Sequence, residues 1–181
     1  MKRIFSIVVP ILAVVAGAVA QDQATDKALL AAPAQLKKDA TVIKWKAGDT
    51  YTYDTVKQGT NNLVCYDKGG LPGEAAFYAE CTVKANLPRA AQNLKFEAIT
   101  DRAARQKALD AAEKDGTRVK PEFGSVWYHA MNDPANPRYH MTISVPGATG
   151  KSLNLPEDGK SGAVWVMNPG TSTAHLMTPG E

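Results

Sequence analysis

Histidine and methionine recur together in the last third of this sequence. The motif His-x-Met occurs at residues 129–131 and 175–177, and His140 is followed directly by Met141. Residues two apart on a strand lie on the same face of a sheet, so each motif can direct an imidazole and a thioether toward one ion. Soft sulfur together with imidazole suits copper, especially Cu(I), better than magnesium or calcium.

The same residues also fit a structural role, which the sequence favours. Methionine on a strand usually fills gaps in a core, and an isolated histidine is usually a surface or hydrogen-bonded residue. Short motifs of this kind also carry a high risk of false matches. If a metal or another ligand binds, the residues expected to contact it are His140, His175, Met141 and Met177.

No other motif points to catalysis, and we assign no catalytic residue. Residues 150–152 and 159–161 both read Gly-Lys-Ser, but a phosphate-binding loop needs a glycine five positions earlier, where Val145 and Asn154 stand. The nucleophile motif Gly-x-Ser-x-Gly is absent from the sequence. The sequence therefore leans against an enzyme, with a hydrolase lacking a recognisable motif as the alternative.

The first twenty residues have the pattern of a cleavable secretory signal. Lys2 and Arg3 precede an apolar run from Ile4 to Val15, and Ala18-Val19-Ala20 forms a small-x-small cleavage site before Gln21. The apolar run is too short to span a bilayer. We expect this segment to be removed and the mature protein to be secreted or periplasmic.

Without residues 1–20 the formal net charge falls from +3 to +1, because they hold two basic residues and no acidic one. This balance predicts no nucleic-acid partner. The rest of the chain, residues 21–181, is long enough for one domain with a hydrophobic core. No later stretch is long or apolar enough for a membrane span. We expect no cofactor, with copper as the alternative.

The two cysteines are expected to form a disulfide. Cys65 and Cys81 are the only thiols, and in an oxidising compartment such a pair is usually bonded. Closing a loop of about sixteen residues stabilises a fold by roughly 3 kcal/mol. Cys65 follows a polar stretch in which Gly59, Thr60 and Asn61 are predicted to form a hairpin turn. We interpret this turn as an anchor that leads into the third strand of a meander.

Strands are predicted on both sides of a central helical region, from β-branched and aromatic residues in short alternating runs. The predicted strands are Thr41–Lys46, Thr50–Lys57, Leu63–Tyr66, Ser125–Met131, Tyr139–Val145, Ala163–Met167 and Ala174–Met177. Loops are expected from Lys68 toward Cys81, over Asn132–Pro137 and over Pro146–Gly162.

The middle of the chain, Pro88–Lys114, is predicted to be mostly helical, with Gly116 as the stop. Within it, Leu94–Ile99 alternates apolar and charged residues and also fits a strand, so this alternative stays open. A shorter helical region at Asp26–Lys38 is expected to be divided by Pro33. The fold class is α+β: a mostly antiparallel sheet, one or two helices packed on one face, and one disulfide.

Several short pieces of the chain resemble a family of small secreted bacterial proteins of uncharacterised function. Its most specific parts are the Gly-Thr-Asn turn leading to Cys65 and the tail Ala174-His175-Leu176-Met177. The other matching pieces are Ala31-Ala32-Pro33, Ala40-Thr41-Val42, Cys81, Val164-Trp165-Val166-Met167 and Gly170-Thr171. The chain departs from the pattern at Asn62, Ser172, Thr173 and His129. The resemblance implies no catalytic or ligand role.

We therefore expect an exported bacterial protein that is non-enzymatic and binds a ligand or partner. One alternative is a periplasmic copper-binding protein that uses His140 and His175 with nearby methionines. The other is the hydrolase mentioned above.

Overall fold

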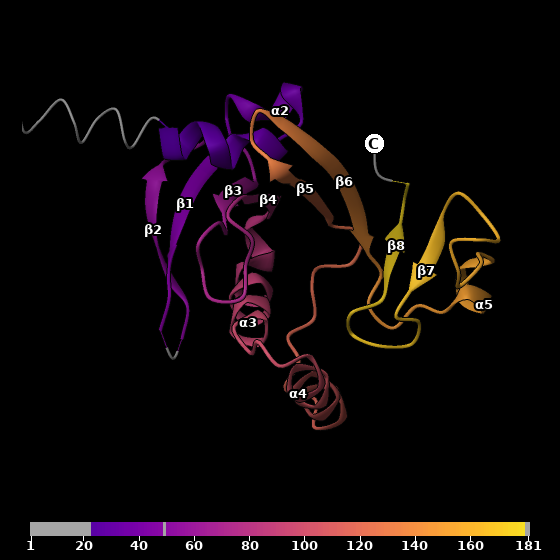
Figure 1. Ribbon diagram of the computed structural model, residues 1–181. Coiled ribbons are helices and arrows are strands. Elements are labelled where there is room, and N and C mark those ends of the chain that lie inside the picture. Colours follow the sequence, from indigo (N-terminus) through magenta and orange to yellow (C-terminus); the bar gives the residue numbers. More distant parts are fainter. Residues whose placement is uncertain (1–22, 49, 180–181) are drawn as a thin grey trace, which may run out of the picture.

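An eight-stranded sheet forms the centre of the protein, seen in a computed structural model that describes residues 23–48 and 50–179 (Figure 1). In chain order its strands are β1 (Thr41–Lys46), β2 (Thr52–Lys57), β3 (Leu63–Asp67), β4 (Tyr78–Val83), β5 (Val126–Asp133), β6 (Asn136–Ser144), β7 (Trp165–Met167) and β8 (His175–Met177). Their order in the sheet is β2-β1-β3-β4-β5-β6-β8-β7. Neighbours are antiparallel except β1 and β3, which are parallel. The predicted α+β class with a mostly antiparallel sheet is confirmed.

Helices pack against both faces of this sheet (Figure 1). They are a helical segment at residues 23–28, η1 (Leu29–Ala31), α2 (Ala34–Lys37), η2 (Lys84–Asn86), α3 (Leu87–Glu97), α4 (Arg102–Lys114) and α5 (Gly150–Leu153). On one face Leu29 of η1 packs with the two cysteines. On the other, Leu87 and Leu94 of α3 pack with aromatic residues, including Trp127. Burial of these apolar side chains supplies the main driving force for the fold.

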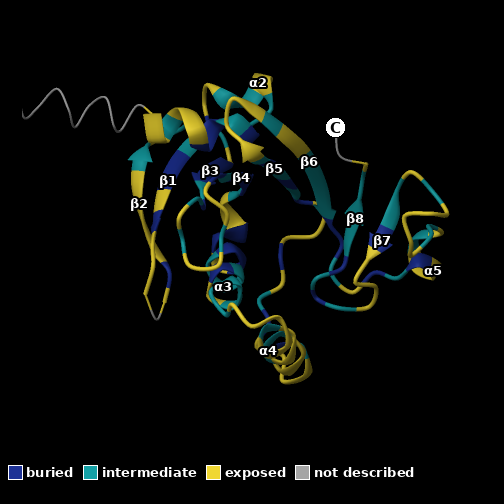
Figure 2. Cartoon of the chain, in the orientation of Figure 1, coloured by how far each residue is buried: buried dark blue, intermediate teal, exposed yellow. Residues whose placement is uncertain are grey.

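The predicted central helical region consists of two helices. α3 runs through Leu94 to Glu97, so this part is helix rather than strand. Asp101 then caps α4, its carboxylate accepting a hydrogen bond from the Ala104 amide at 2.7 Å. Gly116 follows α4 with a positive φ of 75° and ends the helix as predicted. Most residues of α4 are exposed (Figure 2), so it contributes little to the core.

The segment Gly59–Asn62 is not the hairpin turn that the sequence predicted. β3 pairs with β1 rather than with β2, so this segment carries the chain past the end of β1. The amides of Thr60 and Asn61 donate to the Asp39 carbonyl at 2.9 and 3.1 Å. The Asn61 side chain also donates to the Leu36 carbonyl at 2.8 Å. The segment is therefore an anchor, but between the N-terminal region and β3.

Burial explains why the predicted meander is wrong. In a meander β1 would lie at the edge of the sheet, yet Val42 and Ile43 are buried in the cores on opposite faces. Placing β3 beside β1 makes β1 an interior strand and leaves β2 at the edge. β2 suits an edge because most of its residues are exposed.

Three expected loops contain regular structure. The stretch before the second cysteine forms β4, a strand that the sequence reasoning missed. In the expected loop 132–137, Asn132 pairs with Pro137 and Asp133 with Asn136, which extends the β5–β6 hairpin. Asn132 adopts the positive φ of 80° that the local twist requires. The expected loop 146–162 contains α5, which begins at a capping box formed by Thr149 and Ser152.

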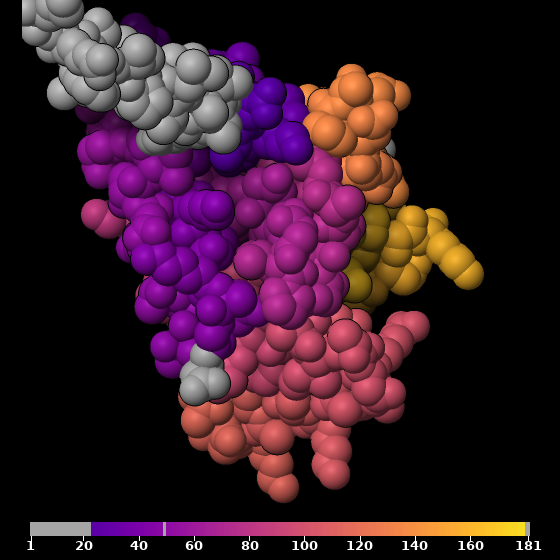
Figure 3. All heavy atoms as spheres, turned by 60° about the vertical axis from the view of Figure 1, so that its left-hand side comes forward, coloured from indigo at the N-terminus to yellow at the C-terminus, as the bar shows by residue number. Residues whose placement is uncertain are grey.

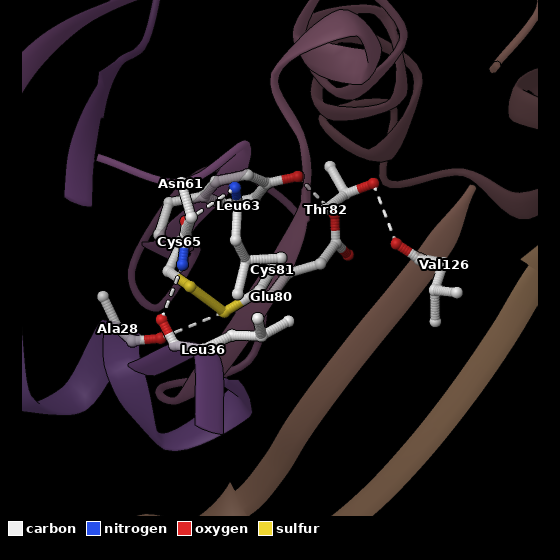
Figure 4. Close-up of a disulfide and its surroundings, with 10 residues drawn as sticks. Ala28, Leu36, Asn61, Leu63, Cys65, Glu80, Cys81, Thr82 and Val126 are labelled. Carbon is white, nitrogen blue, oxygen red and sulfur yellow. Dashed lines mark hydrogen bonds between the residues drawn. A yellow bond between two sulfur atoms is a disulfide. The ribbon is translucent and has the colours of Figure 1, made fainter. Parts of the chain in front are cut away.

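The predicted disulfide between Cys65 and Cys81 is confirmed. The two residues lie directly opposite each other on β3 and β4, with their Cα atoms 4.1 Å apart, and both are fully buried. Figure 4 shows the bond facing Ala28 and Leu36 of the N-terminal region. It joins two adjacent strands, whereas the sequence predicts a loop that leads up to Cys81.

In the described residues no helix has the length and apolar character that crossing a membrane requires. The predicted signal segment, residues 1–20, lies outside the described residues.

Candidate functional site

Four side chains form a row across four neighbouring strands on the face that α3 covers. Tyr66 on β3 is opposite Glu80 on β4, Glu80 is opposite His129 on β5, and His129 is opposite His140 on β6. The Tyr66 hydroxyl donates a hydrogen bond to Glu80. The two imidazoles stack with their ring centres 5.8 Å apart. Tyr66 and Glu80 are buried while both histidines are partly exposed, so the row leads from the core to the surface.

Lys68 lies beside this row and is surrounded by carboxyl groups. Its Nζ is 3.3 Å from Glu74, 3.6 Å from Glu80 and 3.3 Å from Glu97. The same ammonium lies over the ring of Tyr78, 4.2 Å from its centre. Lys68 is only 4% exposed, and a lysine is rarely so buried unless it is paired. One buried cation therefore holds three acidic groups together.

The environment moves the pKa values of two of these carboxyls in opposite directions. Burial alone would raise the pKa of Glu80, but Lys68 and hydrogen bonds from His129 and Tyr66 lower it to about 2. For Glu97, burial raises the pKa to about 8, and the nearby acidic groups add to this against the attraction of Lys68. At neutral pH Glu80 is ionised and Glu97 holds a proton. Two carboxyls with such different pKa values can accept and donate protons at one site.

His129 connects the buried charges to the surface. Its Nδ1 lies 3.4 Å from Glu80 Oε2 and 3.2 Å from the Tyr78 hydroxyl. A carboxylate on one ring nitrogen fixes the orientation of an imidazole and leaves the other nitrogen for a ligand.

A cleft of about 290 Å³ opens beside these residues. Its floor comes from β4, β5 and β6, one wall from α3, and the other wall from β8 and the segment before it. The side chains that line it include Lys68, Tyr78, Glu80, Arg89, Asn93, Glu97, Trp127, His129, His140, Thr142, Ser144, Thr173, His175 and Met177. Figure 1 shows β8 next to β6, on the side of β6 away from β5. In Figure 3 the orange β5–β6 hairpin projects above the yellow C-terminal part of the chain.

Arg89 lies in the α3 wall, one and two helical turns before Asn93 and Glu97. Its guanidinium donates to the Val119 carbonyl, to the Ser172 hydroxyl at 3.3 Å and to the Thr173 hydroxyl at 2.8 Å. These contacts fix the side chain between α3 and the segment that precedes β8.

Three of the four ligand residues predicted from the sequence meet in the cleft. His140, His175 and Met177 line it together, because Met177 is opposite Thr142 and His175 opposite Ser144 in the β6–β8 pair. Met141 follows His140 on the same strand and therefore points to the other face, where it is opposite Tyr128.

One histidine of this group has a defined tautomer. His175 Nδ1 lies 2.7 Å from the Thr173 carbonyl, which can only accept, so Nδ1 carries the hydrogen and Nε2 is the acceptor. Burial lowers the pKa of His175, and burial together with neighbouring His129 lowers the pKa of His140. Both shifts favour the neutral imidazole. In residues 23–48 and 50–179, however, no three His, Cys, Asp or Glu side chains are grouped to hold a metal ion.

Sequence reasoning missed the charged residues of the cleft: Lys68, Glu80, Arg89 and Glu97. The signal was present in Tyr78-Ala79-Glu80-Cys81, where a strand places Glu80 on the same face as Tyr78 and opposite to the cysteine. The sequence predicts the end of a loop at this stretch, and a loop gives no indication that Glu80 is buried. Arg89 and Glu97 share one face of α3, but helix periodicity alone does not show which face is buried.

Comparisons of the chain with models of protein families, with curated proteins and with solved structures find no match.

Proposed function

We propose that this protein binds a small polar ligand in the cleft between α3 and β8. The observation that supports this is the convergence of acidic, basic and imidazole side chains from five elements on one cavity of about 290 Å³. Ligand sites are concave and have a few polar groups aimed inward, and their volumes start near 300 Å³. Titratable groups with shifted pKa values, here Glu80 and Glu97, are also concentrated at such sites.

A cavity-filling variant tests the location of the site. Thr142 lines the cleft on β6, so Thr142→Phe should occupy its floor. The matched control is Thr55→Phe on the exposed edge strand β2. A panel of small polar compounds is screened by ligand-observed NMR against the wild-type protein and both variants. We expect binding that Thr142→Phe abolishes and Thr55→Phe preserves; equal binding to all three proteins would place the site elsewhere.

We further propose that the protein works outside the cytoplasm. The signal pattern in residues 1–20 and the resemblance to small secreted proteins support export, and the buried Cys65–Cys81 disulfide is consistent with it. Mass spectrometry of protein recovered from its native host should find a mature chain that begins at Gln21. Recovery of the intact precursor in the cytoplasm would contradict this proposal.

Copper binding is a second candidate function, because His140, His175 and Met177 line the same cleft. Nε2 of His175 is a free acceptor, and imidazole with thioether sulfur suits Cu(I). A competition titration with Cu(I) compares the wild type with the double variant His140→Ala, His175→Ala. Met141→Ala is the control, since Met141 lies on the opposite face. Equal Cu(I) affinity for the wild type and the double variant would exclude this function.

A further inference from the structure

The Arg89 end of the cleft carries an unbalanced positive charge. Arg89 is 3% exposed and lines the cavity, yet in the described part of the chain no carboxylate forms an ion pair with it. Burial lowers the pKa of Arg89, and the positive charge of Arg118, which is also buried, lowers it further. In the described residues the carboxylate that acts on Arg89 is Glu113, which it reaches through the hydroxyls of Ser172 and Thr173. Arg118 also interacts with Glu113 and, in addition, with Glu97. Arg89 is thus the guanidinium that lacks a direct carboxylate partner there, although buried charges are usually paired.

The end of the cleft near Glu97 carries an excess of negative charge. There Lys68 is one cation among Glu74, Glu80 and Glu97, and in residues 23–48 and 50–179 His129 is the one further basic group that forms an ion pair with any of them. The excess negative charge is smaller than the number of acidic groups suggests, because Glu97 holds a proton at neutral pH. An ammonium group on a ligand can take the place of this proton, since it would sit beside the ionised form of Glu97.

The length of α3 sets the distance between the two ends. Arg89 and Glu97 are eight residues apart on one face, which corresponds to about 12 Å along the helix axis. We take this axial rise as the separation of the two charged groups, because both side chains extend from α3 into the same cleft. Contacts of about 3 Å at each end then leave roughly 6 Å between the charged groups of a ligand. Two residues of extended peptide span about 7 Å. A free α-amino acid is too short to reach both ends of the cleft, because its ammonium and carboxylate groups are bonded to the same carbon.

From these charges and this spacing we propose that the cleft ligand is a zwitterion of dipeptide size. Its ammonium group binds beside Glu97 and Glu80, and its carboxylate binds at Arg89. This proposal rests on the proposed function, because it names the class of ligand for the same cleft. Asn93 lines the cavity between Arg89 and Glu97, and its side-chain oxygen accepts a hydrogen bond from Arg118. Its side-chain NH2 group can donate to the carbonyl of the peptide bond.

Isothermal titration calorimetry with three probes tests the proposal: L-Ala-L-Ala, its N-acetyl form and its C-terminal amide. The N-acetyl form lacks the ammonium group and the amide lacks the carboxylate. We expect the free dipeptide to bind and each capped form to bind about tenfold more weakly or worse, which is typical of losing one charge-assisted hydrogen bond. This comparison uses wild-type protein alone, so it does not depend on how any variant folds.

Two variants test which residue binds each charged group of the ligand. Arg89→Gln should remove the preference for the free carboxylate over the amide, and Glu97→Gln should remove the preference for the free ammonium over the N-acetyl form. Arg102→Gln and Glu122→Gln, at exposed positions, are the matched controls and should leave both preferences unchanged.

The outcomes separate the two proposals. If all three probes bind the wild type equally and Thr142→Phe blocks them, the cleft binds ligands but the zwitterion proposal is wrong. If none of the three binds, the zwitterion proposal is again wrong, and the panel screen with Thr142→Phe and Thr55→Phe judges the cleft independently.

Discussion

Glu80 on β4 lies directly opposite His129 on β5, and its Oε2 is 3.4 Å from Nδ1 of that histidine. The same carboxylate accepts a hydrogen bond from Tyr66 on β3 and lies 3.6 Å from Lys68. One buried carboxylate thus joins the interior of the sheet to a histidine at the cleft. Its partners are charged or polar, and two of them, Tyr66 and Lys68, are buried, so the network should affect stability as well as binding.

Replacing the central cation should be strongly destabilising. Lys68→Met leaves three acidic groups clustered without their common partner, and we expect a loss of about 3–5 kcal/mol in the free energy of unfolding. The control is Lys46→Met, which breaks an ion pair with Asp54 on the exposed surface and should cost less than about 1 kcal/mol. Urea denaturation measures both. Similar small losses for the two variants would show that the buried cluster is not held by Lys68.

Glu97 should make stability fall as the pH rises toward alkaline values. Its pKa is about 8 in the folded protein and near 4.5 ordinarily, so the folded state binds more protons between these values. Its contribution is fully present below pH 4.5 and is lost as the pH rises through 8. The groups that interact with Glu97 include Lys68, Glu74, Glu80, Arg118, Tyr51 and Tyr78. The pKa of Glu80 lies too low for it to titrate in this window.

The measurement is urea denaturation of the wild type and Glu97→Gln at a series of pH values from 5 to 9. The wild type should lose stability relative to the variant as the pH increases. A constant difference between the two across this range would contradict the raised pKa of Glu97.

Loss of the disulfide should destabilise the fold substantially. Cys65 and Cys81 are sixteen residues apart, and the chain-entropy model gives about 3 kcal/mol for a loop of that size. The double variant Cys65→Ala, Cys81→Ala and the reduced wild type should therefore both unfold at lower urea concentration than the oxidised protein. If reduction releases two thiols but leaves the midpoint unchanged, the bond does not contribute in this way.

Gly59 should not tolerate a side chain. A Cβ at this position would lie 2.3 Å from the Asp39 carbonyl oxygen and 2.4 Å from backbone atoms of Ala40 and Thr41. Gly59→Ala must displace backbone, and we expect it to cost about 1–3 kcal/mol. Gly48→Ala is the control, because its Cβ would make only an ordinary contact of 3.6 Å with Thr50. Equal stability of both variants in urea would show that the segment 59–62 is not packed against the end of β1.

The turn residues illustrate how far the sequence could be interpreted. Gly59, Thr60 and Asn61 are of residue types that suit a tight change of direction, and this is what the sequence can indicate about them. Their partners, the Asp39 and Leu36 carbonyls, lie more than twenty residues earlier, and local propensity carries no information about them. The hairpin topology was therefore assigned from proximity along the chain, and it was wrong.

The candidate site was only partly predictable for a similar reason. Strand periodicity was enough to place His175 and Met177 on one face, and the pairing of β6 with β8 then brings His140 to the same cleft. The charged residues come from α3 and β4, and their burial depends on which helix covers which face of the sheet.

The sequence by itself determined the types of most elements, the α+β class and the pairing of its only two cysteines, because these depend on local periodicity and on composition. Tertiary structure alone decided that β1 and β3 run parallel, that Glu80 meets Lys68 and His129, and that Arg89 and Glu97 face one cavity. These relationships join residues far apart in the chain, and they form only when the apolar faces of the sheet and α3 are buried together.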